Sequence, residues 1–265
     1  MKNKEFDAHM RSFEHYHGHT ILPSTYTVLR IDGRSFSKYT KKYKKPFDDY
    51  LHTLMCESAA ETMDDLDGIV AYVESDEVSI LLSTASLPFN GSIEKLVSVS
   101  ASVMSSNFTA LSGDVVSFDS RVISLPNQET VLDYFNWRHA DAVKNSLNTY
   151  AYWLLRSQGL SEFAAHQDLM KKGVDYKNEL LFNHGVNFCD TPEWTRRGSL
   201  IFRVSYMKQG FNPITKQTVM AKRRRVEIYN TIPTGVAYTS LIAEIISSNM
   251  TETRMNQLRE MEYVK

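Results

Sequence analysis

The 265-residue sequence predicts an α+β fold: a βαββαβ (ferredoxin-like) sheet with helices, followed by a mostly helical C-terminal half. Up to residue 126, short β-branched and aromatic runs alternate with longer segments of helical period. Only four residues separate two of these runs, which is typical of a β-hairpin. After residue 126, the chain continues with a long segment that contains no Gly or Pro, which favours helix.

The elements of the first half follow one another with clear ends. Residues 26–31 form the first expected strand, which stops at Asp32-Gly33. Apolar residues recur at helical spacing from 48 to 67, and Gly68 ends that helix. A strand, a strand, a helix and a strand region complete the unit, at residues 69–73, 78–82, 92–111 and 115–125. We expect the first strand to be central and to pair with the strand that returns after the first helix.

The second half predicts helices at 129–156 and 161–172, the first with a possible break at the aromatic residues 134–137. Three further segments have mixed character, at 177–182, 199–207 and 218–229. The sequence contains no repeat and no Pro/Gly-rich linker. We therefore expect a catalytic core at 1–126 and a helical part at 127–265, with a soft boundary that also permits one integrated domain.

Composition excludes several classes of protein. Hydrophobic residues make up 42% and charged residues 23% of the chain, which is the balance of a soluble globular protein and not of a disordered or collagen-like one. No apolar run approaches the roughly 20 residues of a membrane helix, and the N-terminus lacks the apolar segment of a signal peptide. Cys56 and Cys189 lie far apart. We expect a cytoplasmic protein without membrane association.

Basic residues gather in two runs, at 41–45 and 222–225, although the net charge is only −1. Such a run is most often a solvated face. Two runs could also follow a phosphate backbone, as in nucleic-acid-binding proteins. Composition alone does not decide between these interpretations.

Acidic residues stand at the ends of neighbouring strands. Asp32 follows the first strand, and Asp76-Glu77 occupies the tip of the hairpin. Carboxylates on adjacent strands can hold two Mg²⁺ ions that serve phosphoryl or nucleotidyl transfer. Strand-end Asp residues also cap turns, which is the simpler interpretation for Asp32 alone. The combination favours the metal site.

The turn after the first strand is suited to phosphate. Gly33 allows close backbone approach, and the N–H groups that follow it can surround a triphosphate. The lysines at 41–45 follow closely and can meet further phosphates. Asp-Gly is common in turns, so this motif is weak by itself.

Four ordered motifs between residues 26 and 203 resemble the tRNA-His guanylyltransferase family, namely RIDGRSF at 30–36, SDE at 75–77, NWRHAD at 136–141 and KNE at 177–179. The closing RRGS at 196–199 is also similar. The resemblance implies a polymerase-palm-like core that adds nucleotides to tRNA in the 3′–5′ direction. It further implies tRNA and nucleoside triphosphates as partners, and a homotetramer built as a dimer of dimers.

The resemblance also implies site residues. Asp32, Asp76 and the Gly33 carbonyl would bind two Mg²⁺, Glu77 would be the third acidic residue, and Lys45 would serve activation by ATP or GTP. The candidates for nucleotide binding are Asp32, Gly33, Arg34, Ser35, Phe36, Ser37, Ser75, Asp76 and Lys95. The candidates for tRNA binding or activity, which include the basic run, are Asn145, Lys177, Asn178, Lys222, Arg223, Arg224 and Arg225.

Two departures indicate a branch of that family. Where the eukaryotic enzymes carry a histidine linked to tRNA-His selection, this chain has Val143, and their basic stretch near residue 90 is replaced by Asn90-Gly91-Ser92. Both changes favour the guanylyltransferase-like branch, which performs template-dependent repair of tRNA 5′ ends. The alternatives are a dedicated enzyme that adds G−1 to tRNA-His and a palm-fold nucleotide cyclase. Intact Asp32, Asp76 and Glu77 argue against an RNA-binding protein without catalysis.

Overall fold

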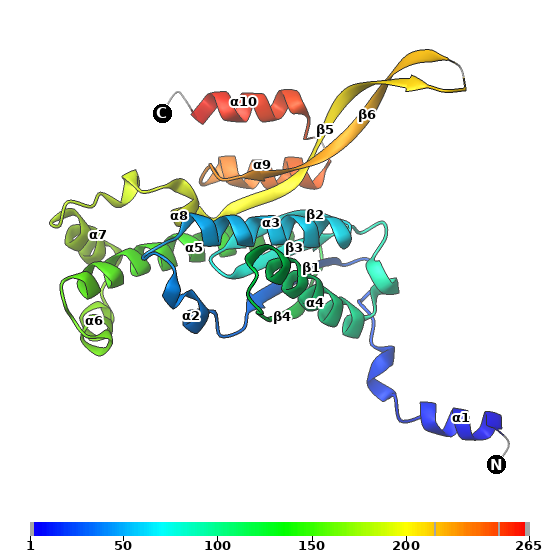
Figure 1. The fold of residues 1–265 in the computed structure, drawn as a ribbon, viewed down its shortest axis with the longest axis horizontal. Helices are drawn as coiled ribbons and strands as arrows, with labels where there is room; N and C mark the ends of the chain where they lie inside the picture. The colour runs from blue at the N-terminus through cyan, green and yellow to red at the C-terminus, as the bar shows by residue number, and fades with distance from the viewer. Residues whose placement is uncertain (1–2, 215, 249, 263–265) are drawn as a thin grey trace.

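The computed structural model describes residues 3–214, 216–248 and 250–262 and shows one antiparallel sheet covered by helices (Figure 1). The six strands lie in the order β4 (Phe118–Leu125), β1 (Tyr26–Gly33), β3 (Glu77–Leu82), β2 (Gly68–Glu74), β5 (Ser199–Asn212) and β6 (Gln217–Tyr229). The expected βαββαβ unit is confirmed as β1, α3 (Asp49–Asp65), β2, β3, α4 (Ile93–Ser112) and β4.

One detail of the expected pairing is wrong. β1 pairs with β3 and β4, and not with β2, the strand that returns after α3. β3 turns back from β2 as a hairpin and takes the position between the two strands. This register places Asp32 directly opposite Glu77, at the end of both strands.

The sheet buries apolar side chains on both faces. Leu29 and Ile31 of β1 belong to the core shared with α3 and α4. Val28, which alternates with them, belongs to the second core. That core includes residues of α5 (Gln128–Ser157), α9 (Val236–Ile246) and α10 (Glu252–Glu262). The polar residues Arg30 and Asp32 follow Val28 along the α5 side of the sheet.

The second half is mostly helical, as expected, but it also supplies the two longest strands. α5 runs without a break through residues 134–137 and is capped by Asn127, whose side chain accepts a 2.9 Å hydrogen bond from the Thr130 N–H. The shorter helices are α6 (Glu162–Leu169), α7 (Val174–Phe182) and α8 (Glu193–Arg197). β5 and β6 form a long hairpin, and its outer part extends beyond the body of the molecule (Figure 1).

The two halves share both the sheet and a core. β5 pairs with β2 through four residue pairs, from Val70 opposite Phe202 to Val73 opposite Ser199. One core cluster combines Val70 and Leu81 of the first half with Phe202 and Tyr238 of the second. At the N-terminus, α1 (Asn3–Arg11) lies away from the body (Figure 1). Among the described residues, no helix is both long and apolar enough to cross a bilayer.

Candidate active site

A pocket of about 440 Å³ opens where β1 and the β2–β3 hairpin end. Its walls come from the loop before α3, from α3 itself, from the hairpin, from α5 and from α8. Among the side chains that line it are Asp32, Phe36, Lys44, Lys45, Asp48, His52, Ser75, Asp76, Glu77, Arg138, Asn145, Trp153 and Trp194. The fold thus brings Asp32, Lys45, Asp76 and Glu77 together, as the sequence predicts.

Asp32 and Asp76 meet because the tip of the hairpin is tied to the end of β1. The Gly33 N–H donates a 3.1 Å hydrogen bond to the Asp76 carbonyl, and Ser75 turns the chain with a φ of 55°. Burial, and secondly the charge of Asp32, raise the pKa of Asp76. No Lys, Arg or His in the described part of the chain forms an ion pair with either carboxylate.

The turn after β1 is held by Phe36, which is buried at the start of the short helix α2 (Phe36–Tyr39). A Cβ on Gly33 would lie 2.4 Å from the Phe36 ring, so the close packing of this turn requires glycine. Of the expected nucleotide contacts, Asp32, Phe36, Ser75 and Asp76 line the pocket. Arg34, Ser35 and Ser37 are exposed in the same turn, outside the lining.

The loop before α3, which carries Lys44 and Lys45, also lines the pocket. Asp48 fixes the end of the loop, because its side chain accepts hydrogen bonds from the backbone N–H of Lys44 (2.9 Å) and of Leu51 (3.0 Å). The Lys45 ammonium lies 5.5 Å from the centre of the Trp153 ring. Burial lowers the pKa of Lys45. A phosphate at this position would offset the cost of keeping Lys45 charged.

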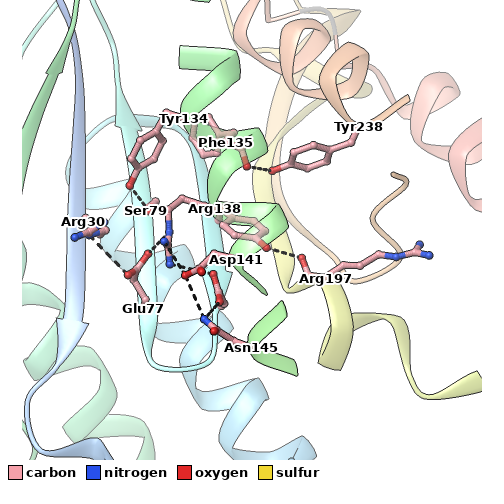
Figure 2. A network of polar contacts seen from close by, with 12 residues as sticks. Arg30, Glu77, Ser79, Tyr134, Phe135, Arg138, Asp141, Asn145, Arg197 and Tyr238 are labelled. Carbon is pink, nitrogen blue, oxygen red and sulfur yellow. Dashed lines mark hydrogen bonds and ion pairs between the residues drawn. The ribbon is translucent and has the colours of Figure 1, made fainter. Parts of the chain in front are cut away.

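A buried polar network joins the hairpin to α5, and Figure 2 labels Glu77, Arg138, Asp141 and Asn145 among its members. Arg138 is 5% exposed. Its guanidinium nitrogens lie 3.2 Å from Glu74, 2.8 Å from Glu77 and 3.1 Å from Asp141. The Asn145 amide donates to Glu74 and Asp141, each at 3.2 Å. Burial raises the pKa of Glu74 to about 7 although Arg138 opposes that shift.

Further hydrogen bonds extend this network across the sheet (Figure 2). The hydroxyls of Ser79 and Tyr134 lie 2.8 Å apart, and the Tyr72 hydroxyl donates to the Arg197 carbonyl at 2.7 Å. Gly198 follows with a φ of 71°, and a Cβ there would lie 2.3 Å from the Val73 carbonyl oxygen. The RRGS motif therefore marks a close contact between α8 and β2.

An aromatic wall closes one side of the pocket. The His52 ring stacks on Trp194 with 4.1 Å between centroids, and its Nε2 lies 3.1 Å from the Ser199 hydroxyl. Burial lowers the pKa of His52 to about 4, so this ring is neutral at physiological pH. The sequence interpretation assigned no role to His52, Trp194, Glu74, Arg138 or Asp141.

Several expected residues lie outside the pocket. Lys95 is exposed on α4, and Lys177 and Asn178 are half-buried on α7, which packs against α5. Lys222, Arg223 and Arg224 are exposed on β6. Arg225 differs from them, since it pairs with Glu227 at 2.6 Å and with Glu252 at 2.8 Å. The basic run thus contains one residue that is engaged within the fold.

Comparison with protein families gives two matches in succession. Residues 7–126 match the model of tRNAHis guanylyltransferase, and residues 129–247 match that of the Thg1 C terminal domain. The tRNA(His) guanylyltransferase of Saccharomyces cerevisiae is 33% identical over 220 residues, which cover 77% of this chain and 92% of that protein. The enzyme of the same name from Neurospora crassa is 34% identical, over 77% of this chain and 74% of that protein.

Solved structures agree with these matches. The crystal structure of the Saccharomyces cerevisiae enzyme has a TM-score of 0.67 at 32% identity and covers 72% of this chain and 90% of its own. A bacterial tRNA(His) guanylyltransferase-like protein in complex with ATP has a TM-score of 0.69 at 25% identity and covers 92% of this chain and 98% of its own. This chain therefore belongs to the tRNAHis guanylyltransferase family, nucleotidyltransferases that add nucleotides at the 5′ end of tRNA.

Proposed function

We propose that this enzyme repairs tRNA 5′ ends by template-dependent addition in the 3′–5′ direction. The 5′-monophosphate of the tRNA first attacks the α-phosphorus of ATP or GTP, which releases pyrophosphate and leaves a nucleotidylated end. The 3′-hydroxyl of an incoming nucleoside triphosphate then attacks the tRNA 5′-phosphate and displaces the nucleoside monophosphate. A triphosphorylated end needs no activation and loses pyrophosphate instead.

The observation that carries this proposal is the placement of two unpaired carboxylates and two lysines around one pocket. Asp32, Asp76, Lys44 and Lys45 all line it. A nucleoside triphosphate presents phosphates to the lysines and cation-binding oxygens to the carboxylates. The bacterial relative, at 25% identity, is described in complex with ATP, which supports ATP as a substrate.

The acidic pair fits Mg²⁺. Each carboxylate lies beside the other without a cationic partner among the described residues, and burial together with this repulsion raises the pKa of Asp76. Asp32, Asp76 and the Gly33 carbonyl are hard oxygen ligands of the kind that Mg²⁺ prefers. The described residues contain no cluster of three or more His, Cys, Asp or Glu side chains, so phosphates and water would complete two sites. When bound, Mg²⁺ would neutralise charge that develops on the transferred phosphoryl group.

We assign separate roles to Lys45, to Glu77 and to the turn after β1. Lys45 would bind the phosphates of the activating nucleotide, whose negative charge favours the protonated lysine. Glu77 lies 2.8 Å from Arg138 and 3.7 Å from Arg30, so we assign it to positioning the hairpin and not to free metal binding. The exposed side chains of Arg34, Ser35 and Ser37 lie in the same turn and would hold the incoming triphosphate.

The repair branch is supported by two departures from the pattern of the eukaryotic enzymes. Val143 stands on α5 where the family's tRNA-His-selecting histidine is expected, and residues 90–92 lack the basic side chains of the eukaryotic enzymes. Base pairing with the opposite acceptor strand can supply the selectivity instead, because only a paired nucleotide is held in position for attack.

A dedicated G−1 guanylyltransferase is the second candidate. It is favoured by the fungal relatives of that name, which are 33% and 34% identical to this chain. Because the chain belongs to the guanylyltransferase family, we do not retain the nucleotide cyclase as a candidate.

We further propose that the enzyme is cytoplasmic and forms a homotetramer, built as a dimer of dimers. Sedimentation of the purified enzyme tests this assembly.

The deciding experiment uses 5′-truncated tRNAs that differ in the template base and in the anticodon. With ATP and all four nucleoside triphosphates, we expect addition of whichever nucleotide pairs with the 3′ strand, whatever the anticodon. Addition of G alone, or acceptance of the His anticodon alone, would establish the second candidate. Asp32→Ala should abolish addition, while Asp65→Ala, an exposed residue at the far end of α3, should not.

A further inference from the structure

Trp137 is a large aromatic side chain on the surface beside the active site. It lies on α5 directly before Arg138, and 54% of it is exposed. Its neighbour Arg138 lines the pocket and pairs with Glu74 and Glu77. The other aromatic side chains of α5 are buried or half-buried, so Trp137 differs from them in its exposure.

Two arginines hold the orientation of the Trp137 ring. The guanidinium carbon of Arg138 lies 4.8 Å from the ring centre and that of Arg30 lies 5.9 Å away. The Tyr134 ring meets it edge-on at 5.9 Å. These neighbours are themselves fixed, because Arg30 and Arg138 both face Glu77 and Tyr134 bonds to Ser79. The exposed tryptophan is therefore a pre-oriented surface and not a freely rotating side chain.

The position of Trp137 relative to the acidic pair suits a nucleic-acid end. Arg30 and Asp32 share one face of β1, two residues apart, which is roughly 7 Å along a strand. Because the Arg30 guanidinium lies 5.9 Å from the Trp137 ring, Arg30 connects the ring to the face of β1 that carries Asp32. Arg121 of β4 lies opposite Arg30, and its side chain is 51% exposed and pairs with Asp119 at 3.7 Å.

We infer that Trp137 stacks on a nucleobase at the acceptor end of the tRNA while the 5′-phosphate lies at Asp32 and Asp76. This inference depends on the proposed function for its choice of ligand. A fixed aromatic ring flanked by arginines is the arrangement that binds bases without reading their identity. Such a contact suits an enzyme that lets the template strand choose the nucleotide.

The test compares Trp137→Ala with Trp137→Phe in tRNA binding without nucleotide and in nucleotide addition. We expect Trp137→Ala to weaken tRNA binding and raise KM for tRNA by about fivefold to 150-fold, the measured range for removal of one stacking interaction. The value of kcat at saturating tRNA should change far less, and Trp137→Phe should recover most of the affinity. Phe163→Ala on α6, a residue that is 74% exposed, is the matched control and should bind tRNA normally.

A tRNA series with single abasic sites in the acceptor end identifies the stacked base. At one of these sites the wild type and Trp137→Ala should bind equally, since the base to be stacked is missing. Equal affinity of wild type and Trp137→Ala for intact tRNA would overturn the inference. A change in sedimentation in Trp137→Ala would do so too, because the ring would then bind another protein chain. Binding is measured without catalysis, so failure of wild-type addition would refute the proposed function alone.

Discussion

The β2–β3 hairpin carries two kinds of acidic residue within four positions. Asp76 faces Asp32, and neither has a cationic partner in the described part of the chain, whereas Glu74 and Glu77 share Arg138. The unpaired carboxylates repel each other and need an external cation. The paired ones are neutralised within the protein. Pairing thus separates residues that meet the substrate from residues that hold the hairpin in place.

Removing an unpaired carboxylate should lower the rate of nucleotide addition without lowering stability. Asp76→Asn keeps the shape of the side chain but removes a ligand charge, so we expect addition to fall about a thousandfold, or ~4 kcal/mol in the barrier. The free energy of unfolding at neutral pH should stay equal or rise, because the variant relieves repulsion with Asp32. Initial rates at saturating Mg²⁺ and urea unfolding check both parts. A variant that loses stability and activity together would place Asp76 in the structural group.

Removing Arg138, the cation shared by Glu74 and Glu77, should lower the stability of the fold. Arg138→Ala leaves Glu74 and Glu77 buried without their partner, and we expect a loss of about 3–5 kcal/mol in the free energy of unfolding. Arg156→Ala, on the same helix, removes a weaker pair and should cost about 1 kcal/mol or less. Arg138→Lys should recover part of the loss. Urea unfolding of the three variants is the measurement, and equal costs at both arginines would contradict the role of the network.

The pH dependence of stability tests whether burial or the Arg138 charge dominates at Glu74. Its pKa is about 7 in the folded protein, above the ordinary value of 4.5, so the folded state holds this proton more tightly than the unfolded state. Stability from this group is therefore complete below about pH 4.5 and is lost as the pH rises to about 7. Glu74→Gln cannot ionise, and its stability should match the wild type at pH 4 and exceed it at pH 8. The difference should grow by at most about 1.4 kcal/mol per pH unit.

Urea titrations across that pH range measure this difference. Glu61→Gln, on an exposed position of α3, is the control and should follow the wild type at every pH. A Glu74→Gln variant that becomes less stable than the wild type as the pH rises would show that the Arg138 charge outweighs burial at this site.

The same distinction extends to the basic run on β6. Arg223 and Arg224 are exposed and form no ion pair within the described chain, whereas Arg225 pairs with Glu227 and Glu252. Replacing Arg223 and Arg224 by Ala should lower the salt dependence of tRNA binding, by about one unit of slope for each phosphate that the variant no longer neutralises. Arg225→Ala should leave that slope nearly unchanged and instead loosen α10, which hydrogen exchange detects. An unchanged slope in the double variant would make the run a solvated surface.

The acidic pair could be predicted because its position depends on local elements. β1, β2 and β3 are buried on both faces, so they stand out as apolar runs, and the short connection fixes the hairpin. Asp32 and Asp76 follow directly at the ends of these runs. The exact pairing of β1 was harder to predict, since the order of strands depends on where the hairpin inserts into the sheet, which no local pattern indicates.

The network could not be predicted in the same way. Arg138 belongs to a helix on which a charged residue usually faces water, and only its distant partners Glu74 and Glu77 reveal that it is buried. The long hairpin was missed for a related reason. Its outer part is exposed on both faces, so no alternation of apolar and polar residues marks the strands, and its inner part depends on pairing with β2.

The pairing of β5 with β2 also sets an order of events during synthesis on the ribosome. The βαββαβ unit is complete once β4 has emerged, but one edge of its sheet, along β2, stays open until residues 199–202 are made. Open strand edges pair readily with other chains. A nascent chain that is stalled or cleaved after α5 would therefore expose an unpaired strand edge. Pairing of β5 with β2 covers this edge and should protect the first half from aggregation.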